Sequence, residues 1–306
     1  MTVNFPNRLT PEFNETQQVT IDRFKETFRK IGYSVWKDRI GRIGLLLIVL
    51  FLVLAIFAPW IAPHDPGSIN YADDGSAKVL ESPSLEHPLG TDNRAQDIFS
   101  QWIYGTRVTL LVAFFAGIGV ATIGTTIGLL SGYYKGSTDL ALMRIVDVLY
   151  GIPVTPLILV LVLFFGTSLT TIILAFFLIL WRTMARIVRA QTLSMSERAF
   201  VKSAKAAGAS DRRIMFYHIA PNLLPIILVE TTFVMAGAIS IEAGIAFLGF
   251  GPSNMLSWGG MLEATFAAGG LNVWWWVLPP GLGITFTILS FFYISRALES
   301  VVNTDV

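Results

Sequence analysis

Residues 200–225 read FVKSAKAAGASDRRIMFYHIAPNLLP and interrupt the chain with a polar segment between two strongly apolar ones. We expect two short helices here, at 200–207 and 210–219. Gly208 should separate them, because glycine tolerates turn conformations, and Pro221 should stop the second. Small side chains fill the first helix: Ser203, Ala204, Ala206 and Ala207. Such a surface lets another backbone approach closely, so the segment is typical of a docking element.

The composition of the whole chain indicates an all-α integral membrane protein. Apolar residues make up 53% of the 306 residues and charged ones 14%, and the mean hydropathy is +0.62. A formal net charge of +1 gives no reason to expect a nucleic-acid partner, so the expected surroundings are lipid. The absence of cysteine excludes disulfides and thiolate metal sites. The polar first 42 residues do not fit a secretory signal, so the first apolar run is predicted to be an uncleaved anchor.

Six stretches are apolar enough, at roughly 20 residues each, to cross a membrane as helices. They are residues 43–62, 108–132, 143–165, 169–188, 223–247 and 277–296. We therefore divide the chain into a polar tail at 1–42 and a transmembrane domain at 43–306.

The placement of Lys and Arg sets the predicted orientation. Most of them fall in the N-terminal tail and in the segment 190–222, which are predicted to be cytosolic. The predicted outer loops, 63–107 and 248–276, are poor in basic residues, and the first is rich in acidic ones. Both termini are therefore predicted to lie in the cytosol, and the turn-rich first loop is expected to form an ordered cap.

An amphipathic helix is predicted ahead of the first span. Its apolar positions recur at steps of three and four: Ile21, Phe24, Phe28, Ile31 and Val35. Basic residues lie between them, so the helix could rest on the inner leaflet or pack on the protein, two alternatives that the sequence leaves equally open.

Two ridges of small residues are predicted to bring helices together, because helices in lipid approach most closely where side chains are small. Gly124, Gly128 and Gly132 form the first ridge, and Ala236, Ser240 and Gly244 form the second. Packing within the chain is the favoured interpretation for both, and a subunit interface is the alternative.

Ionisable residues inside the spans are the next candidates, because such groups are costly in a membrane and pair or line water. Arg144 and Asp147 lie one helical turn apart, which predicts an ion pair, with a gate as the alternative. Glu230 and Glu242 lie close to one face of the fifth span. They predict either a polar translocation path or hydrogen bonds within the subunit.

Three further groups of residues have a plain structural interpretation. Arg182, Arg186 and Arg189 share one helix face and are expected to reach the headgroups, with contact to the cytosolic loop as the alternative. The tryptophans at 258 and 274–276 fit an interfacial belt. The three histidines are scattered along the chain and are predicted to lie on opposite sides of the membrane, so we expect no metal site.

Several blocks of the chain match a known family. The segment KSAKAAGASDRRIMFYHIAPN resembles the cytosolic signature of ATP-binding-cassette (ABC) importer permeases. The other matching blocks include HPLGTD at 87–92, IYGTRVTLLV at 103–112, GLLSGYYKG at 128–136, ARIVRAQTLS at 185–194 and EAGIAFLGFG at 242–251. Over about residues 40–300 the chain is similar to the second, C-type, permease subunit of dipeptide, oligopeptide and nickel importers.

The resemblance implies a type I ABC importer permease fold with six transmembrane helices. It also implies that residues 200–222, called the coupling segment below, form the coupling helix that enters a cleft of an ATPase subunit. The residues carried over to this contact are Lys202, Ser203, Ala204, Gly208, Ala209, Ser210, Ile214, Pro221 and Asn222. Lys202 and Ser203 stand where the family has Glu and Ala, which implies a complementary acid on the ATPase.

The function implied is that of a non-enzymatic permease in the plasma membrane. It would pair with a B-type permease, two ATPase subunits that hold ATP and Mg²⁺, and an external binding protein. The chain has no GxxxxGK[ST] phosphate loop, so the energy would enter from those partners. The expected cargo is peptide, with oligosaccharides or nickel chelates as alternatives, and Glu230, Glu242 and Asp147 are the candidates for the path. The rival hypothesis is a proton-coupled secondary transporter that uses Glu230 and Glu242.

Overall fold

The structure is a computed structural model that describes residue 29, residues 32–252 and residues 254–304. In these residues the chain is helical apart from turns, loops and two isolated bridges. The predicted positions Ile21, Phe24, Phe28 and Ile31 lie outside the described residues. Val35 is buried against Val229 and Leu298, so this end of the amphipathic helix packs on the protein.

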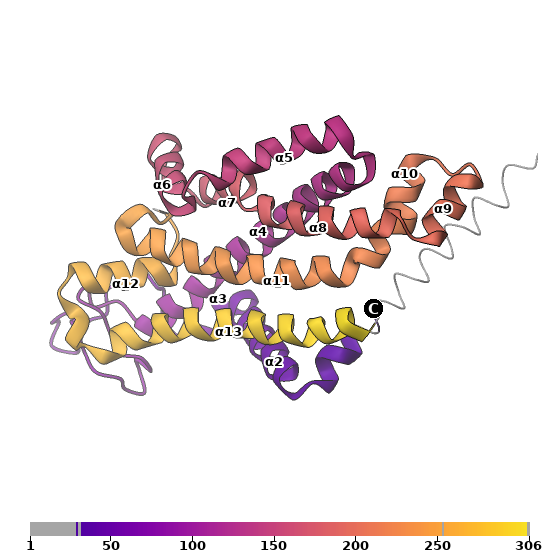
Figure 1. The fold of residues 1–306 in the computed structure, drawn as a ribbon. Coiled ribbons are helices and arrows are strands. Elements are labelled where there is room, and N and C mark those ends of the chain that lie inside the picture. Colours follow the sequence, from indigo (N-terminus) through magenta and orange to yellow (C-terminus); the bar gives the residue numbers. More distant parts are fainter. Residues whose placement is uncertain (1–28, 30–31, 253, 305–306) are drawn as a thin grey trace, which may run out of the picture.

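Within the described residues, five helices are long and apolar enough to cross a membrane. They are α2 (Arg39–Ile56), α4 (Ile98–Tyr134), α7 with α8 (Leu169–Ser196), α10 to η2 (Asp211–Phe250) and α13 (Trp274–Thr304), whose apolar part is Trp274–Ser300. Helices α2, α4, α11 (Ala220–Ile245) and α13 pack side by side through most of the molecule (Figure 1).

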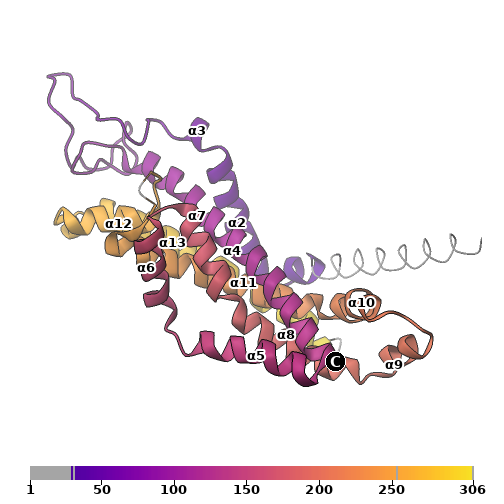
Figure 2. The same ribbon diagram turned by 90° about the horizontal axis from the view of Figure 1, so that it is seen from above.

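The third predicted span is not one straight helix. Helices α5 (Gly136–Tyr150) and α6 (Val154–Phe165) meet at an angle of 85°, so residues 143–165 do not form one continuous helix (Figure 2). The break falls at Gly151-Ile152-Pro153, where proline disfavours the helical conformation of the residue before it. Arg182 from α8 (Trp181–Ser196) donates to the carbonyl of Leu149 at the end of α5. The six-span count holds if this bent pair is taken as one span.

Several helix boundaries differ from the predicted ones. Helix α4 begins at Ile98, ten residues before the predicted start, because the carboxylate of Asp97 caps it by accepting from the Ser100 N–H at 2.7 Å. The first span ends at Ile56, and the short helix α3 (Ala58–Ile61) follows it. The connecting loop therefore covers residues 62–97, shorter than the predicted 63–107.

The first glycine ridge packs within the chain, as the favoured interpretation predicted. A Cβ added at Gly124, Gly128 or Gly132 would lie 2.5–2.7 Å from the Cβ of a residue on α8. The three facing residues are Met184, Val188 and Thr192, so two four-residue repeats run in register. This close approach joins α4 to α8 through their whole contact. The second ridge differs, because Ala236 is buried while Ser240 and Gly244 are exposed.

Replacing Gly128 by Ala should destabilise the protein, since the new methyl group would lie 2.7 Å from the carbonyl oxygen of Ala185. Overpacking of this kind lowers the free energy of unfolding by about 1–3 kcal/mol. This loss exceeds the gain of about 1 kcal/mol expected from the higher helix propensity of alanine. Gly281 on α13 is the matched control, because nothing lies within 4 Å of its added Cβ. Thermal unfolding in detergent should show a lower midpoint for Gly128→Ala only. Equal midpoints for the two variants would contradict the α4–α8 register.

Aromatic residues close the end of the bundle near the 62–97 loop. The rings of Trp102 and Trp258 stack at 5.8 Å, and the Trp258 indole N–H donates to the Trp102 carbonyl at 2.9 Å. Trp258 and Trp276 are fully buried, whereas Trp274 is 56% exposed. The predicted interfacial belt is therefore wrong for Trp258 and Trp276, which belong to the core between α2, α4, α12 (Trp258–Ala267) and α13.

Candidate functional site

The coupling segment projects from one end of the helical bundle. Figures 1 and 2 both show α9 (Ala199–Ala206) and α10 (Asp211–Arg213) beyond the last turns of α4 and α8 and the first turn of α11. The 62–97 loop and α12 lie at the opposite end in both views. A body that contacts the coupling segment would therefore be separated from that loop by the length of the bundle.

A glycine turn ends the first helix of the coupling segment, as predicted. Gly208 adopts a φ of +81°, which side chains rarely tolerate. The Gly208 N–H donates to the Lys205 carbonyl, and the Ala209 N–H donates to the Ala204 carbonyl at 3.1 Å. This pair of hydrogen bonds is a Schellman motif, which satisfies the last carbonyls of α9 and reverses the chain.

The second half of the segment continues into the fifth span without a stop. Ser210 caps α10 by accepting from the Arg213 N–H, and a wide π-helical turn, η1 (Ile214–Ile219), leads directly into α11. The prediction that Pro221 ends the helix was wrong. Pro221 lies in the first turn of α11, where a missing N–H is tolerated. The Asn222 side-chain amide donates to the His218 carbonyl at 2.6 Å, so this carbonyl has a hydrogen-bond donor where η1 passes into α11.

Buried side chains anchor the coupling segment to the bundle. Val201, Ile214 and Ile219 are at most 3% exposed and belong to one cluster with residues of α4 and α8, among them Leu129 and Val188. The predicted coupling residues thus fall into two groups. Ile214 is an internal anchor. Five of the others are exposed, namely Lys202, Ser203, Gly208, Ser210 and Asn222, and Ala204, Ala209 and Pro221 are half-buried.

Three exposed aromatic side chains in this region were missed by the sequence interpretation. Phe200, Phe216 and Tyr217 are 41%, 48% and 39% exposed. The sequence signal was available: each lies one or two positions from an anchor residue in a short helix, a spacing that places anchors and aromatics on different faces. Together with the small residues of α9 they add apolar groups to an outer surface that also carries exposed charged residues, namely Lys202, Lys205, Asp211, Arg212 and Arg213.

Lys202 and Lys135 share one carboxylate within the chain, that of Glu197. Nζ of Lys202 lies 3.1 Å from Oε2 of Glu197, and Lys135 approaches the other carboxylate oxygen at 2.6 Å. The hydrogen bond from Lys135, followed by that from Lys202, holds the pKa of Glu197 below its usual range. Because this one carboxylate faces two ammonium groups, the cluster keeps a net positive charge, and the acid expected on the ATPase stays a prediction. The Tyr133 hydroxyl also donates to Asp211 at 2.7 Å, which ties the segment to the end of α4.

The three arginines on α8 contact α5, which none of the sequence-based alternatives proposed. Arg186 pairs with Asp147 at 2.6 Å, and both side chains are about half exposed. Arg189 donates from two nitrogens to the two carboxylate oxygens of Asp139, at 2.5 Å each. The predicted Arg144–Asp147 pair is thus wrong. Helical spacing alone does not show that a cation on another helix lies closer.

Replacing Asp139 by Asn should destabilise the α5–α8 contact, because the bidentate ion pair also receives the Ser131 hydroxyl and the Asp139 side chain is only 19% exposed. We expect a loss of about 1–2 kcal/mol, at the lower end for charged hydrogen bonds because part of the pair meets solvent. Glu197→Gln is the control, because that carboxylate is 60% exposed and screened. Chemical unfolding should detect a change for Asp139→Asn alone, and a comparable loss in both variants would contradict this ranking.

The two acidic residues of α11 have different environments. Glu230 is half-buried, whereas Glu242 is 1% exposed, and neither of its carboxylate oxygens has a hydrogen-bond partner among the described residues. The Ser257 hydroxyl is the polar group that faces Glu242, without reaching hydrogen-bond geometry. The described residues therefore do not provide the hydrogen bonds that the second alternative, pairing of Glu242 within the subunit, requires. Buried polar groups without partners are rare and call for an explanation.

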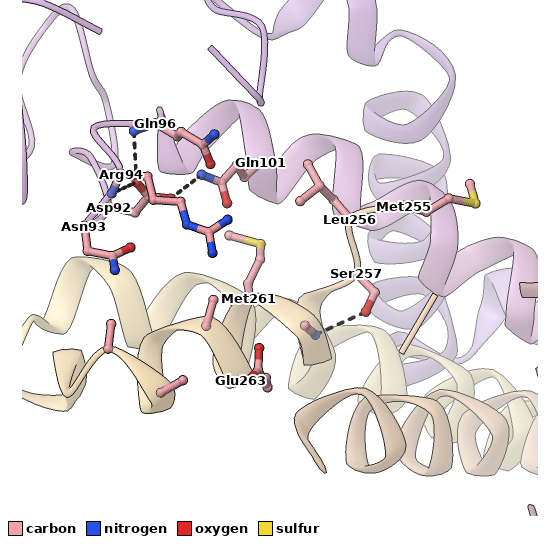
Figure 3. Close-up of a pocket in the computed structure, with 14 residues that line it drawn as sticks. Asp92, Asn93, Arg94, Gln96, Gln101, Met255, Leu256, Ser257, Met261 and Glu263 are labelled. Atoms are coloured by element: carbon pink, nitrogen blue, oxygen red, sulfur yellow. Dashed lines mark hydrogen bonds between the residues drawn. The ribbon is translucent and has the colours of Figure 1, made fainter. Parts of the chain in front are cut away.

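A cavity of about 410 Å³ opens between the end of the 62–97 loop and α12. Figure 3 shows Asp92, Arg94 and Gln101 on one side, and Met261 and Glu263 of α12 on the other. The Gln101 amide donates to Asp92 at 2.8 Å, which fixes that wall. The sequence interpretation assigned no role to these residues. The cavity lies at the opposite end of the molecule from the coupling segment.

The fold and the site together define a class: a polytopic α-helical membrane subunit that presents an anchored, exposed helical turn and has no phosphate-loop motif of its own. The sequence pattern described as "Binding-protein-dependent transport system inner membrane component" matches residues 124–305, and the N-terminal transmembrane domain of oligopeptide transport permease C matches residues 33–83. The chain belongs to this family of ABC transporter permeases.

Curated relatives cover nearly the whole chain. A dipeptide transport system permease protein of Alkalihalophilus pseudofirmus is 34% identical over 96% of this chain and 95% of its own length. An oligopeptide transport system permease protein of Bacillus subtilis is 32% identical over 91% and 92%. A glutathione transport system permease protein of Escherichia coli is 35% identical over 96% and 95%.

A solved structure shares the fold. It is an inward-facing MetNI methionine ABC transporter, whose matched chain has a TM-score of 0.53 and 17% identity, over 67% of this chain and 96% of that one. The predicted fold, an ABC importer permease, is thus confirmed. The family assignment also favours the permease over the proton-coupled alternative, and this chain is a multi-pass membrane component of an ABC transporter.

Proposed function

We propose that this chain is a permease subunit of an ATP-driven, binding-protein-dependent importer, and that it receives the energy of ATP hydrolysis through the coupling segment. The observation that carries the proposal is the two-sided construction of that segment. Its exposed side offers small and aromatic residues, while Val201 and Ile214 join it to the core between α4 and α8. A force on the exposed side is therefore transmitted to two membrane-spanning helices.

The partners follow from what the chain lacks. Without a phosphate loop it requires two ATPase subunits, which would hold ATP and Mg²⁺, so this chain itself needs no cofactor. A B-type permease would complete the translocation path. The exposed small residues Ser240 and Gly244 on α11 suit close approach of a second permease. An external binding protein would deliver the cargo.

The orientation proposed is cytosolic for both termini and for the coupling segment, in the plasma membrane of a bacterium or archaeon. The excess of Lys and Arg in the tail and at 190–222 supports it. The 62–97 loop and the cavity beside α12 would then face outward, where a binding protein docks.

Peptides are the proposed cargo, because the relatives include permeases of dipeptide and oligopeptide transport systems. For the path through the membrane we propose Glu230, Glu242 and Asp147, with Glu242 supported best. Its carboxylate is buried without a partner in the described residues, whereas Asp147 is engaged with Arg186. A switch between inward- and outward-facing states would change these surroundings.

Reconstitution tests the proposal. The chain is purified with its genomic neighbours and placed in proteoliposomes with the binding protein. We expect ATP hydrolysis that vanadate inhibits and that peptide-loaded binding protein stimulates, together with peptide uptake. Sugars and nickel complexes are the comparison cargoes. Uptake that persists without the ATPase subunits would overturn the proposal, and stimulation by a sugar or nickel complex alone would overturn only the cargo.

A further inference from the structure

Two histidines that the sequence interpretation treated as scattered lie together in the structure. The rings of His64 and His87 are 4.7 Å apart, and Glu86 stands beside them, with Oε1 at 3.8 Å from Nε2 of His87. One donor atom from each of these three residues lies within 4.8 Å of the other two. His64 follows α3 and the others lie 22 and 23 positions later, so only the fold of the 62–97 loop brings them together.

Hydrogen bonds at the start of α4 fix this cluster in place. Nδ1 of His87 lies 3.0 Å from Oδ1 of Asp97, and Oδ2 of Asp97 accepts from Ser100. The Ser100 hydroxyl oxygen in turn accepts from the backbone N–H of His64 at 3.2 Å. Asp97 therefore orients one ring directly and holds the other residue through a single serine.

One ring nitrogen of His64 and one of His87 lie within 4.8 Å of each other and of a Glu86 carboxylate oxygen. In the tautomer whose Nδ1–H donates a hydrogen bond to Asp97, Nε2 of the His87 ring carries a lone pair that can bind a metal. His87 is completely buried, and neither its Nε2 nor Nδ1 of His64 has a hydrogen-bond partner in the described part of the chain. A carboxylate behind a histidine is the usual support of a metal-binding imidazole, since it sets the tautomer and the ring direction.

We propose that His64, His87 and Glu86 bind a divalent transition-metal ion of the zinc class. Two imidazole nitrogens with one carboxylate oxygen suit Zn²⁺ and its neighbours rather than Mg²⁺ or Ca²⁺, which take oxygen ligands. Lys78 pairs with Oε2 of Glu86 at 2.6 Å and leaves Oε1 toward the histidines. A tetrahedral zinc ion holds its ligand atoms about 3.3 Å apart, so a small contraction of the cluster completes three ligands and leaves one position open.

The metal would join His64, three residues after the end of α3, to Glu86 and His87 in the later part of the 62–97 loop, and His87 would connect it through Asp97 to the start of α4. This role is separate from transport energy and from the coupling segment at the other end of the bundle. It goes beyond the proposed function, and it holds for either orientation of the chain.

Zinc titration of the full chain, in lipid nanodiscs and without an affinity tag that contains histidine, tests the proposal. Competition with a chromophoric chelator should give one Zn²⁺ per chain. His64→Ala and Glu86→Gln should each weaken binding at least tenfold. These variants should fold, because His64 is only half-buried and the Glu86 side chain is 58% exposed. Their unfolding midpoints without metal check this.

His218→Ala is the matched control, because His218 is the third histidine of a chain that has no cysteine. It should retain the wild-type stoichiometry and affinity. Co²⁺ substitution should add the visible absorption of a four-coordinate site in the wild type and the His218 variant only. Absence of stoichiometric Zn²⁺ binding in the wild type, or equal affinity in the His64 and Glu86 variants, would overturn the proposal.

Discussion

Replacing Gly208 by Val should reduce both peptide-stimulated ATP hydrolysis and transport in the assembled transporter. Gly208 adopts a φ of +81°, where a side chain costs about 1–2 kcal/mol and a β-branched one costs more. The turn would therefore leave its native conformation, and the hydrogen bonds of Gly208 and Ala209 to the end of α9 would be lost. Since about 1.4 kcal/mol corresponds to a factor of ten, we expect peptide-stimulated ATPase activity and uptake to fall roughly tenfold or more.

Gly75 provides a matched control for this variant. It has a φ of +80°, and, like Gly208, nothing lies within 4 Å of an added Cβ. Gly75→Val therefore imposes the same local strain at the other end of the molecule. The measurement is stimulated ATPase activity and uptake in proteoliposomes at equal protein content. Equal losses in the two variants would show that strain acts through stability, and full activity of Gly208→Val would remove the turn from the coupling mechanism.

Replacing Glu242 by Met should stabilise the chain while reducing transport. The carboxyl group of Glu242 is buried without a hydrogen-bond partner among the described residues, and such a group costs about 1–3 kcal/mol. Met has a similar length and removes both polar atoms, so the free energy of unfolding should rise by that amount. A buried ionisable side chain that lowers stability inside a membrane-spanning helix is typical of a functional residue. We therefore expect the removal of the Glu242 carboxyl group to reduce uptake.

Glu230→Met is the control on the same helix, because Glu230 is only half-buried and its removal should change stability less. Unfolding in detergent and uptake in proteoliposomes are measured for both variants. A loss of stability in Glu242→Met would mean that the carboxyl group makes a contact in the assembly. A gain in stability with unchanged uptake would contradict its assignment to the path.

Local patterns in the sequence predicted much of the coupling segment. The break at Gly208 follows from the conformational freedom of glycine, and the small-residue ridge on α4 follows from a spacing of four. Pro221 misled the prediction, because proline stops a helix in its interior but fits its first turn. Pro221 lies in the first turn of α11 because that helix begins only at Ala220, after the π-helical turn η1. The sequence alone did not show where η1 ends and α11 begins.

Contacts between distant segments were beyond the reach of local patterns. Arg186 reaches Asp147 from another helix, 39 residues away, so the pair could not be distinguished by spacing from the wrong Arg144 alternative. The clustering of His64 with His87 depends on Asp97 and Ser100 at the start of α4. The bend between α5 and α6 had a visible signal in Pro153, but the length and hydropathy of 143–165 outweighed it.

Cross-linking at the coupling segment tests the central claim most directly. The chain has no cysteine, so Ser203→Cys introduces one reactive group on the exposed surface of α9, and Ser82→Cys places its control in the 62–97 loop. The two variants are assembled with the transporter in membranes and treated with a short reagent that reacts with the introduced thiol at one end and, on illumination, with any neighbouring C–H or N–H group at the other. The account predicts a covalent product between Ser203→Cys and the ATPase polypeptide, with loss of ATP-dependent uptake, and none from Ser82→Cys. Cross-linking of Ser82→Cys to the ATPase, or its failure at Ser203→Cys in an active transporter, would contradict it.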